Sequence, residues 1–326
     1  MENTINVRAL IGESPCDVAA AIQDVIDSHP NHTLFFPDGE YVIERPLCTP
    51  ADPRKSVSLR LADFAILRAA EGWSSEEAMV RLGGKDPFNT ITIPGSNYGL
   101  EGGIIDGRGV ARAVSIDSGR ETYVRCLSIK NALCGIHIKH GANNNSSDSD
   151  IYNVNIVGND ARDSVGVLVE GSDNTFTNMR IAHVFVGFDL RSGGNMLRNI
   201  HPLFNVPGLT SEQYSETVAF LINARSRHNW FDYCYSDQFA TGFRTLRGNG
   251  NFVNCYCYWY SGKEKRHVAF ASPVPFRGRI NGLEIAGSAH PDAPIRFAEG
   301  LCLSDDAVID GVYLGETRLT EQDFCN

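Results

Sequence analysis

The sequence lacks the features of several large protein classes. No run of about 18 apolar residues is present, so we expect no membrane-spanning helix and no membrane partner. No stripe of basic residues appears and the formal net charge is −10, so we expect no nucleic-acid partner. The first ten residues lack the charged and apolar segments of a signal peptide, which predicts a cytoplasmic protein.

The nine cysteines also lack a pattern. Their number is odd and no two of them form a Cys-x-x-Cys pair, so neither a disulfide framework nor a zinc site is indicated. We expect buried free thiols, with Cys234, Cys255 and Cys257 pointing inward. No motif for a cofactor or a metal ion is found, and we expect none.

From residue 124 onward the chain repeats itself, with segment starts 21 to 34 residues apart. The first aligned column is apolar and contains Val124, Ile151, Phe176, Leu197, Phe231, Phe252 and Ile280. Two places on, a column rich in asparagine contains Cys126, Asn153, Asn178, Asn199, Tyr233, Asn254 and Gly282. Repeats of this length without helical periodicity predict a β-solenoid in which like columns stack at roughly 4.8 Å.

Two further registers agree with this repeat. Asn174, Asn195, Asn229 and Asn251 each precede an apolar pair, where stacked asparagines can bond to one another as a ladder. A glycine between apolar residues recurs at Gly135, Gly166, Gly187 and Gly242, where the chain bends or backbones crowd. Three registers in phase indicate an all-β fold.

The N-terminal part differs from the repeats. Residues 17–27 predict an amphipathic helix with Asp17 as its cap, followed by short strands from Thr33, from Glu40 and around Leu59. A solenoid needs its open end covered, and this helix is the natural cover. We therefore predict a single domain over residues 1–326. Its expected parts are the cap and first strands in 1–45, early coils with excursions in 46–123, regular coils in 124–315 and a tail in 316–326.

These residues also carry a resemblance. Within residues 17–43, two motifs resemble the opening of the pectate-lyase superfamily. They are Ala-Ala-Ile-Gln before a strand and Phe-Phe-Pro-Asp-Gly-Glu-Tyr after it. The segment Gly-Gly-Ile-Ile-Asp-Gly-Arg-Gly at 102–109 resembles its early-coil strand. The resemblance implies a right-handed parallel β-helix, activity on carbohydrates and, often, a homotrimer. The polygalacturonase pattern of paired aspartates, Gly-His-Gly and Arg-Ile-Lys is missing, so no catalytic residue is carried over.

The columns nevertheless locate a candidate site. Residues next to the inward column face outward because strand side chains alternate. On neighbouring coils the outward positions hold Arg180, His201, Tyr235, Asp237, Tyr256 and Tyr258. The longest insertion, residues 204–217, brings Glu212 and Glu216 beside this face, and the segment after Tyr258 brings Trp259, Lys263 and Glu264. Long loops on a rigid scaffold are common functional sites.

Each of these residues also has a structural interpretation, such as strand propensity for the tyrosines or a surface ion pair for Arg180. As a site, they favour cleavage or transfer of a glycosidic bond in an oligosaccharide. The expected catalytic residues are Asp237, His201, Glu264, Glu212 and Glu216. The expected substrate-binding residues are Arg180, Tyr235, Tyr256, Tyr258, Trp259 and Lys263. Two alternatives stay open: β-elimination on a uronic acid with Arg180, His201 and Tyr235 in the central roles, and a non-catalytic carbohydrate-binding or fibre-like protein.

Overall fold

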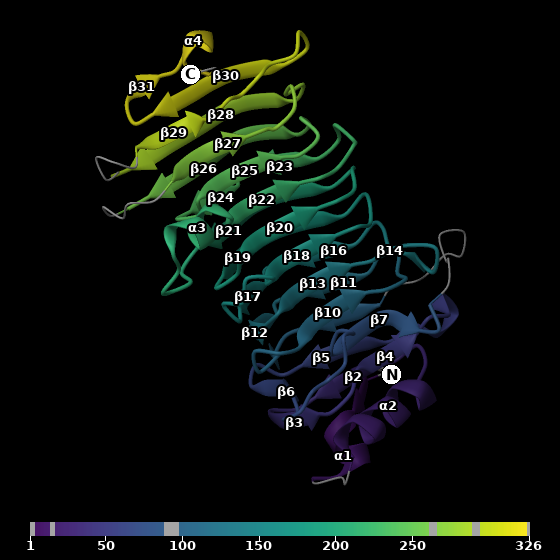
Figure 1. Ribbon diagram of the computed structural model, residues 1–326. Coiled ribbons are helices and arrows are strands. Elements are labelled where there is room, and N and C mark those ends of the chain that lie inside the picture. The colour runs from purple at the N-terminus through teal and green to yellow at the C-terminus, as the bar shows by residue number, and fades with distance from the viewer. Residues whose placement is uncertain (1–3, 14–16, 88–97, 261–265, 289–293, 325–326) are drawn as a thin grey trace. The chain divides into compact units, whose positions relative to one another are not determined.

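The computed structural model describes residues 4–13, 17–87, 98–260, 266–288 and 294–324 (Figure 1). The chain divides into two compact units. The first contains Met1–Asn159 and Val167–Asn174, and the second contains Asp160–Gly166 and Thr175–Asn326. Both are built from short strands that return to the same sheets coil after coil, so the predicted right-handed parallel β-helix is confirmed. That the two units form a single domain stays a prediction.

In the first unit, strands of one sheet alternate along the chain with strands of another. The first sheet of this unit contains β1 (Thr4–Asn6), β2 (Thr33–Phe36), β3 (Gly39–Ile43), β5 (Ser58–Leu61), β6 (Ala65–Ala69), β8 (Gly99–Glu101), β9 (Ile104–Asp106), β11 (Tyr123–Arg125), β12 (Ser128–Ala132), β16 (Asp150–Tyr152) and β17 (Asn155–Gly158). The other contains β4 (Leu47–Pro50), β7 (Val80–Lys85), β10 (Arg112–Ile116), β13 (Cys134–Ile138) and the part of β18 (Val165–Val169) that belongs to this unit. A small antiparallel ribbon joins β14 (His140–Gly141) to β15 (Asn144–Asn145).

The second unit has the same construction with longer strands. One of its sheets contains β19 (Thr175–Ala182), β21 (Met196–Leu203), β23 (Trp230–Asp232), β24 (Tyr235–Asp237), β26 (Asn251–Trp259), β28 (Arg279–Gly287), β30 (Val308–Leu314) and β31 (Thr317–Arg318). The other contains β20 (Val186–Leu190), β22 (Val218–Ile222), β25 (Thr241–Thr245), β27 (His267–Ala271) and β29 (Ile295–Ala298). Two short helices, α3 (Ser211–Ser215) and α4 (Glu321–Phe324), complete this unit.

The predicted cap helix is α2 (Val18–Ser28), preceded by the short α1 (Val7–Ile11). The Asp17 carboxylate accepts a hydrogen bond from the backbone N–H of Ala20 at 2.7 Å, which satisfies one of the free donors at the helix start. Ile22 and Ile26 are fully buried on the face that packs against the first strands. A one-turn 3₁₀ helix (Pro53–Lys55) follows later in this unit.

The apolar columns stack as predicted. In the second unit, Phe176 lies beside Leu197, Leu197 beside Phe231, and Phe231 beside Phe252. All of them are buried, and the Phe231 and Phe252 rings stack with centroids 4.8 Å apart. Each of these coils thus places a large apolar side chain in the same core position.

The asparagine-rich column has a backbone explanation. Its members have φ angles near +50°, for example +55° at Asn178, +52° at Asn199 and +49° at Asn254. Asparagine tolerates this left-handed conformation better than other side chains with a Cβ atom. The turn bends each strand before it enters the segment whose side chains form the candidate site.

The other two registers are also explained. The Asn229 amide oxygen accepts a hydrogen bond from the backbone N–H of Asn195 at 3.0 Å, and the Asn251 amide donates to the Asn229 carbonyl at 3.1 Å. At Gly187 a Cβ atom would lie 2.5 Å from the Ala219 carbonyl oxygen, so only glycine fits there. Cys234, Cys255 and Cys257 are buried free thiols, as predicted.

Candidate functional site

One column of outward side chains crosses a sheet of the second unit. Strand register places its members side by side in the order Arg180, His201, Tyr235, Tyr256, Glu284 and Tyr313. The residues on either side of each member point into the core, as Met179 and Ile181 do around Arg180. The alternation of strand side chains therefore gathers residues more than 130 positions apart in the sequence onto one surface.

A groove with a volume of about 830 Å³ lies over this column. Its lining includes every member of the column together with Asn199, Tyr233, Asn254 and Gly282 from the left-handed turns. Ligand sites in proteins typically have volumes of roughly 300–1,000 Å³. The predicted residues Arg180, His201, Tyr235 and Tyr256 thus share a groove large enough for several sugar rings.

Aromatic rings form the floor of this groove. The His201 and Tyr235 rings stack with centroids 4.0 Å apart and an interplanar angle of 15°. The Tyr256 ring follows at 4.8 Å from Tyr235, tilted by 41°. The Tyr258 ring lies 6.1 Å from Tyr256, and this predicted residue is not among those that line the groove. Aromatic pairs at such distances stabilise one another beyond the area that they bury. The rings are therefore packed on one another without a ligand.

Asp237 lies two residues after Tyr235 on the same face, at the end of β24, and contacts two residues of the groove without being one of its lining residues. The Tyr235 hydroxyl donates to its Oδ2 at 3.2 Å, and His201 Nε2 lies 3.5 Å from the same oxygen. The side chains of Asp237 and His201 are 14% and 21% exposed. Burial of the Tyr235 side chain raises its pKa most, and the negative charge of Asp237 raises it further. This phenol therefore stays protonated and acts as a donor.

Two polar atoms of this group have no hydrogen-bond partner within the described part of the chain. They are Oδ1 of Asp237 and Nε2 of His201, and both are buried. Buried polar atoms are nearly always hydrogen-bonded in folded proteins, and exceptions are common where a ligand or water completes the set. Both atoms thus keep hydrogen-bonding capacity that the described residues do not use.

Sequence reasoning missed Glu284. Its carboxylate lines the groove one strand beyond Tyr256, in the same outward column. Burial of the Tyr256 side chain raises its pKa most, and the negative charge of Glu284 raises it further. The signal was present in the alignment of the repeats, but the predicted site ended one coil too early. In the strand register, Glu284 lies two strands away from Asp237 and two residues back along the strand direction. These spacings place the two Cα atoms about 12 Å apart.

Trp259 was predicted to bind substrate, and this prediction is wrong. The side chain is fully buried and its indole N–H donates to the Phe239 carbonyl at 2.6 Å. Alternation explains the error, because Trp259 follows the outward Tyr258 and must point into the core.

The two acidic residues of the insertion do not line the groove. Glu216 forms a surface ion pair with Arg162, Oε2 to Nε at 2.7 Å, and Glu212 is exposed in the first turn of α3. The insertion is held instead by Tyr214, whose hydroxyl donates to the Gln238 carbonyl at 2.8 Å. The structure therefore does not bring Glu212 or Glu216 to Asp237.

Two other predicted residues, Lys263 and Glu264, lie outside the described residues. Arg180 lines the groove and donates to the carbonyl of Met179 at 3.2 Å. No group of three or more His, Cys, Asp or Glu side chains suited to a metal ion occurs among the residues that the structure describes. No helix of those residues is long and apolar enough to cross a membrane.

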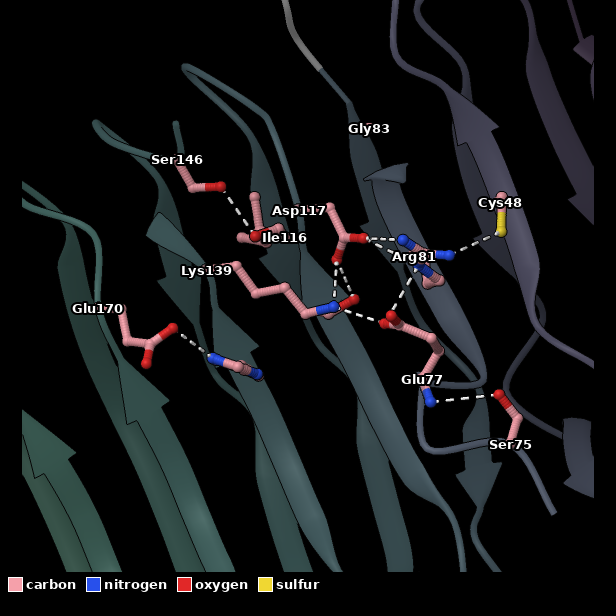
Figure 2. Close-up of polar contacts among 12 residues, drawn as sticks. Cys48, Ser75, Glu77, Arg81, Gly83, Ile116, Asp117, Lys139, Ser146 and Glu170 are labelled. Atoms are coloured by element: carbon pink, nitrogen blue, oxygen red, sulfur yellow. Dashed lines mark hydrogen bonds and ion pairs between the residues drawn. The ribbon is translucent and has the colours of Figure 1, made fainter. Parts of the chain in front are cut away.

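A second group of charged side chains lies in the first unit and has a different character. Figure 2 shows Asp117 between Arg81 and Lys139, with Glu77 reaching the same two cations from the loop before β7. Arg81 Nε lies 2.8 Å from the Asp117 carboxylate, and Lys139 Nζ lies 2.5 Å from Glu77. The Asp117 side chain has no exposed surface and also accepts from the Ser115 hydroxyl. This network fastens the loop to the sheet.

No protein-family model matches the chain, and no curated protein matches it. Solved structures with the same fold do match. A tailspike protein from an Acinetobacter baumannii bacteriophage, a capsular polysaccharide depolymerase, aligns with a TM-score of 0.60 at 11% identity. That match covers 95% of this chain and 58% of the tailspike, so this chain spans less than two thirds of it.

Two further structures are similar. The endo-xylogalacturonan hydrolase of Aspergillus tubingensis aligns with a TM-score of 0.53 at 14% identity, over 92% of this chain and 88% of the hydrolase. The tailspike protein of an E. coli bacteriophage aligns with a TM-score of 0.58 at 9% identity, over 95% of this chain and 67% of the tailspike. At these identities the likeness concerns the fold. The fold that the resemblance implies is therefore confirmed.

Proposed function

We propose that the groove of the second unit binds an oligosaccharide and that Asp237 takes part in cleaving a glycosidic bond. The observation that carries the proposal is the mostly buried pair Asp237 and His201 beside the aromatic floor. Each of the two has a buried polar atom without a hydrogen-bond partner among the described residues. Aromatic faces suit the apolar faces of sugar rings, and the unpartnered atoms suit hydroxyl groups. Support also comes from the neighbours, which include a polysaccharide depolymerase and a hydrolase.

Each residue of the group has a distinct task in this proposal. Asp237 transfers the proton as general acid or base. Tyr235 holds the carboxylate through its hydroxyl, since the raised pKa of this phenol keeps it protonated. His201 contributes a second hydrogen bond at the reacting group, because its Nε2 lies 3.5 Å from Asp237 and has no hydrogen-bond partner within the described residues.

Hydrolysis of a glycosidic bond needs a second carboxylate, and we assign this task to Glu284. Inverting enzymes place their carboxyl groups about 6.5–9.5 Å apart so that a water fits between them, whereas retaining enzymes hold them about 5–5.5 Å apart. With Cα atoms about 12 Å apart, side chains that lean toward each other reach the wider separation. We therefore infer inversion of configuration.

A second reaction is favoured by one observation. Arg180 and His201 are register neighbours that both line the groove. A cation beside a base is what β-elimination from a uronic acid requires. In that case Arg180 neutralises the sugar carboxylate, and Glu284 has no chemical task.

The test is incubation of the purified protein with xylogalacturonan, unbranched galacturonan and bacterial capsular polysaccharides. New reducing ends without ultraviolet absorbance indicate hydrolysis, and absorbance from an unsaturated product indicates elimination. Binding without either product indicates a non-catalytic carbohydrate-binding protein. Absence of both binding and products across the set contradicts the proposal.

The homotrimer implied by the resemblance stays a prediction of its own. The groove described above is lined by residues of one chain, and whether a second copy adds to it is part of this prediction. Light scattering measures the mass in solution, and a monomer would remove the trimer without affecting the site.

A further inference from the structure

Tyr233 occupies a backbone position that does not suit it. In the second unit the left-handed column contains Asn178, Asn199, Tyr233, Asn254 and Gly282, and φ at Tyr233 is +53°. Asparagine and glycine adopt this conformation readily, whereas a bulky side chain there is a genuine outlier. Strained backbone of this kind persists where the fold imposes it and is common at functional sites.

The fold does not repay this strain through contacts of the side chain. The Tyr233 side chain is 66% exposed, and among the described residues its hydroxyl and ring have no hydrogen bond or ring contact. One coil earlier, the Asn199 amide donates to the Asn178 amide oxygen at 2.7 Å, so asparagine in this column adds a side-chain bond. An asparagine at position 233 would therefore suit the fold better than the tyrosine does.

The position of Tyr233 suggests what the tyrosine is for. It lines the main groove and also a second hollow of about 530 Å³. The lining of this hollow includes Thr177, Arg198 and Asp232, which precede the left-handed turn on β19, β21 and β23. Asn199 and Tyr233 belong to both depressions, so Tyr233 stands on the ridge between them.

The second hollow has the character of a site for a neutral sugar. Arg198 and Asp232 face each other with Nε 3.4 Å from Oδ2, and Thr177 and Asn178 add polar groups without charge. The charges of the pair offset each other, which disfavours a charged ligand and leaves several donors and acceptors for hydroxyl groups. Because the hollow lies to the side of the main groove, a linear chain that follows the groove does not enter it.

We propose that the protein recognises a branched oligosaccharide, whose backbone lies in the main groove and whose neutral branch sugar packs on Tyr233 and enters the second hollow. This inference rests on the proposed function, because it uses the same groove. Tyr233 is a specificity residue in this arrangement. Its strained backbone is retained because the exposed ring provides an aromatic face on the ridge.

The probes are a printed array of plant and bacterial oligosaccharides in matched pairs, each pair with the same backbone and with or without one branch. The readout is the ratio of binding to the branched and the linear member. We expect the wild type to prefer branched members. Tyr233→Asn should lower this preference about tenfold, which corresponds to about 1.4 kcal/mol. Tyr233→Phe should keep it.

The same variant has a second readout that needs no ligand. Tyr233→Asn relieves the strain and should raise the thermal midpoint by about 1–2 °C. The matched control is Cys126→Asn in the first unit, where φ is +54° and the thiol accepts a weak hydrogen bond from Asn153 at 3.8 Å. This control should leave the binding ratio unchanged.

Each other outcome overturns the inference. If the wild type binds linear members as well as branched ones, recognition of the branch is contradicted, while the proposed function is unaffected. A preference that survives Tyr233→Asn assigns the branch to other residues. Failure to bind any member removes this inference and the proposed function together.

Discussion

The two groups of outward charged residues differ in how completely their polar atoms are paired. In the first unit, Asp117 is fully buried, accepts hydrogen bonds from Arg81 and Ser115, and forms an ion pair with Lys139. In the second unit, Asp237 is slightly exposed, and one of its oxygens has no partner among the described residues. Burial of a carboxylate is therefore common to both, and pairing is what separates them.

This difference has an energetic meaning. Two cations beside a buried carboxylate compensate the loss of its hydration, and removing one partner of such a group is strongly destabilising. An unpartnered buried oxygen lowers the stability of the protein until a ligand or water binds it. The first arrangement stabilises the fold, and the second leaves one carboxylate oxygen without a hydrogen-bond partner among the described residues.

The largest effect is expected from Asp237→Asn on turnover of a confirmed substrate. Loss of a general acid or base typically costs roughly 10²–10⁴-fold in rate, and the amide cannot transfer the proton. The thermal midpoint should change little, because the amide oxygen still accepts from Tyr235. Initial rates and calorimetry measure the two effects.

The matched control for Asp237→Asn is Glu216→Gln, which removes a carboxylate that pairs with Arg162 outside the groove. This variant should keep the wild-type rate. A wild-type rate in Asp237→Asn would instead place the reaction elsewhere and remove the distinction between the two groups.

Asp117→Asn should show the opposite behaviour. We expect a loss of about 3–5 kcal/mol in the free energy of unfolding, because two largely covered cations lose the buried anion that they share. The activity per folded molecule should not change. Denaturant titration measures the loss.

Should Asp117→Asn fail to fold, Glu77→Gln tests the same network from its solvent side. The Glu77 side chain is 44% exposed, so the loss should be about 1 kcal/mol or less. Reduced activity with unchanged stability in either variant would show that the network is itself a functional site.

The same contrast shows what the sequence alone can reveal. The repeat predicts the coils and their inward columns because each coil repeats the same burial pattern, as the stacked Phe231 and Phe252 show. It also predicts which residues share the outward face, including His201, Tyr235 and Asp237. Period-two alternation determines both results.

The insertion was beyond this kind of reasoning. Glu212 and Glu216 lie on a segment outside the repeat, so no column fixes where they point, and a helix turns them away from the groove. Trp259 is the reverse case, because strict alternation would have placed it inward. The backbone strain at Tyr233 could not be predicted either, because the aligned repeats show a tyrosine in the asparagine-rich column but not the sign of its φ angle.

Glu284→Gln distinguishes the two candidate reactions. If the protein hydrolyses a glycosidic bond with Asp237 and Glu284, the rate should fall about 100-fold or more. His201→Ala and Tyr235→Phe should then have milder effects. If it is a lyase, Glu284→Gln should stay near the wild-type rate while the other two variants are severely impaired.

The control for Glu284→Gln is Glu212→Gln, an exposed carboxylate on α3 that does not line the groove. It should have no effect on the rate. A loss at Glu212 equal to that at Glu284 would mean that the insertion reaches the substrate after all.

The smallest effect concerns alkaline pH and the Tyr235 phenol. In the unfolded chain a tyrosine loses its proton near pH 10. In the folded protein, burial raises the pKa of Tyr235 most, and the negative charge of Asp237 raises it further. Above about pH 10 the unfolded state therefore binds fewer protons than the folded state, and rising pH favours unfolding. The stability contributed by Tyr235 is complete below about pH 10 and is lost as the pH rises toward its folded pKa.

Tyr235→Phe should flatten the decline in urea midpoint above about pH 10, whereas Tyr260→Phe, at a residue that is 59% exposed, should not. An unchanged decline in Tyr235→Phe would mean that the phenol is solvated, and that it cannot hold Asp237 in the way the comparison between the two groups requires.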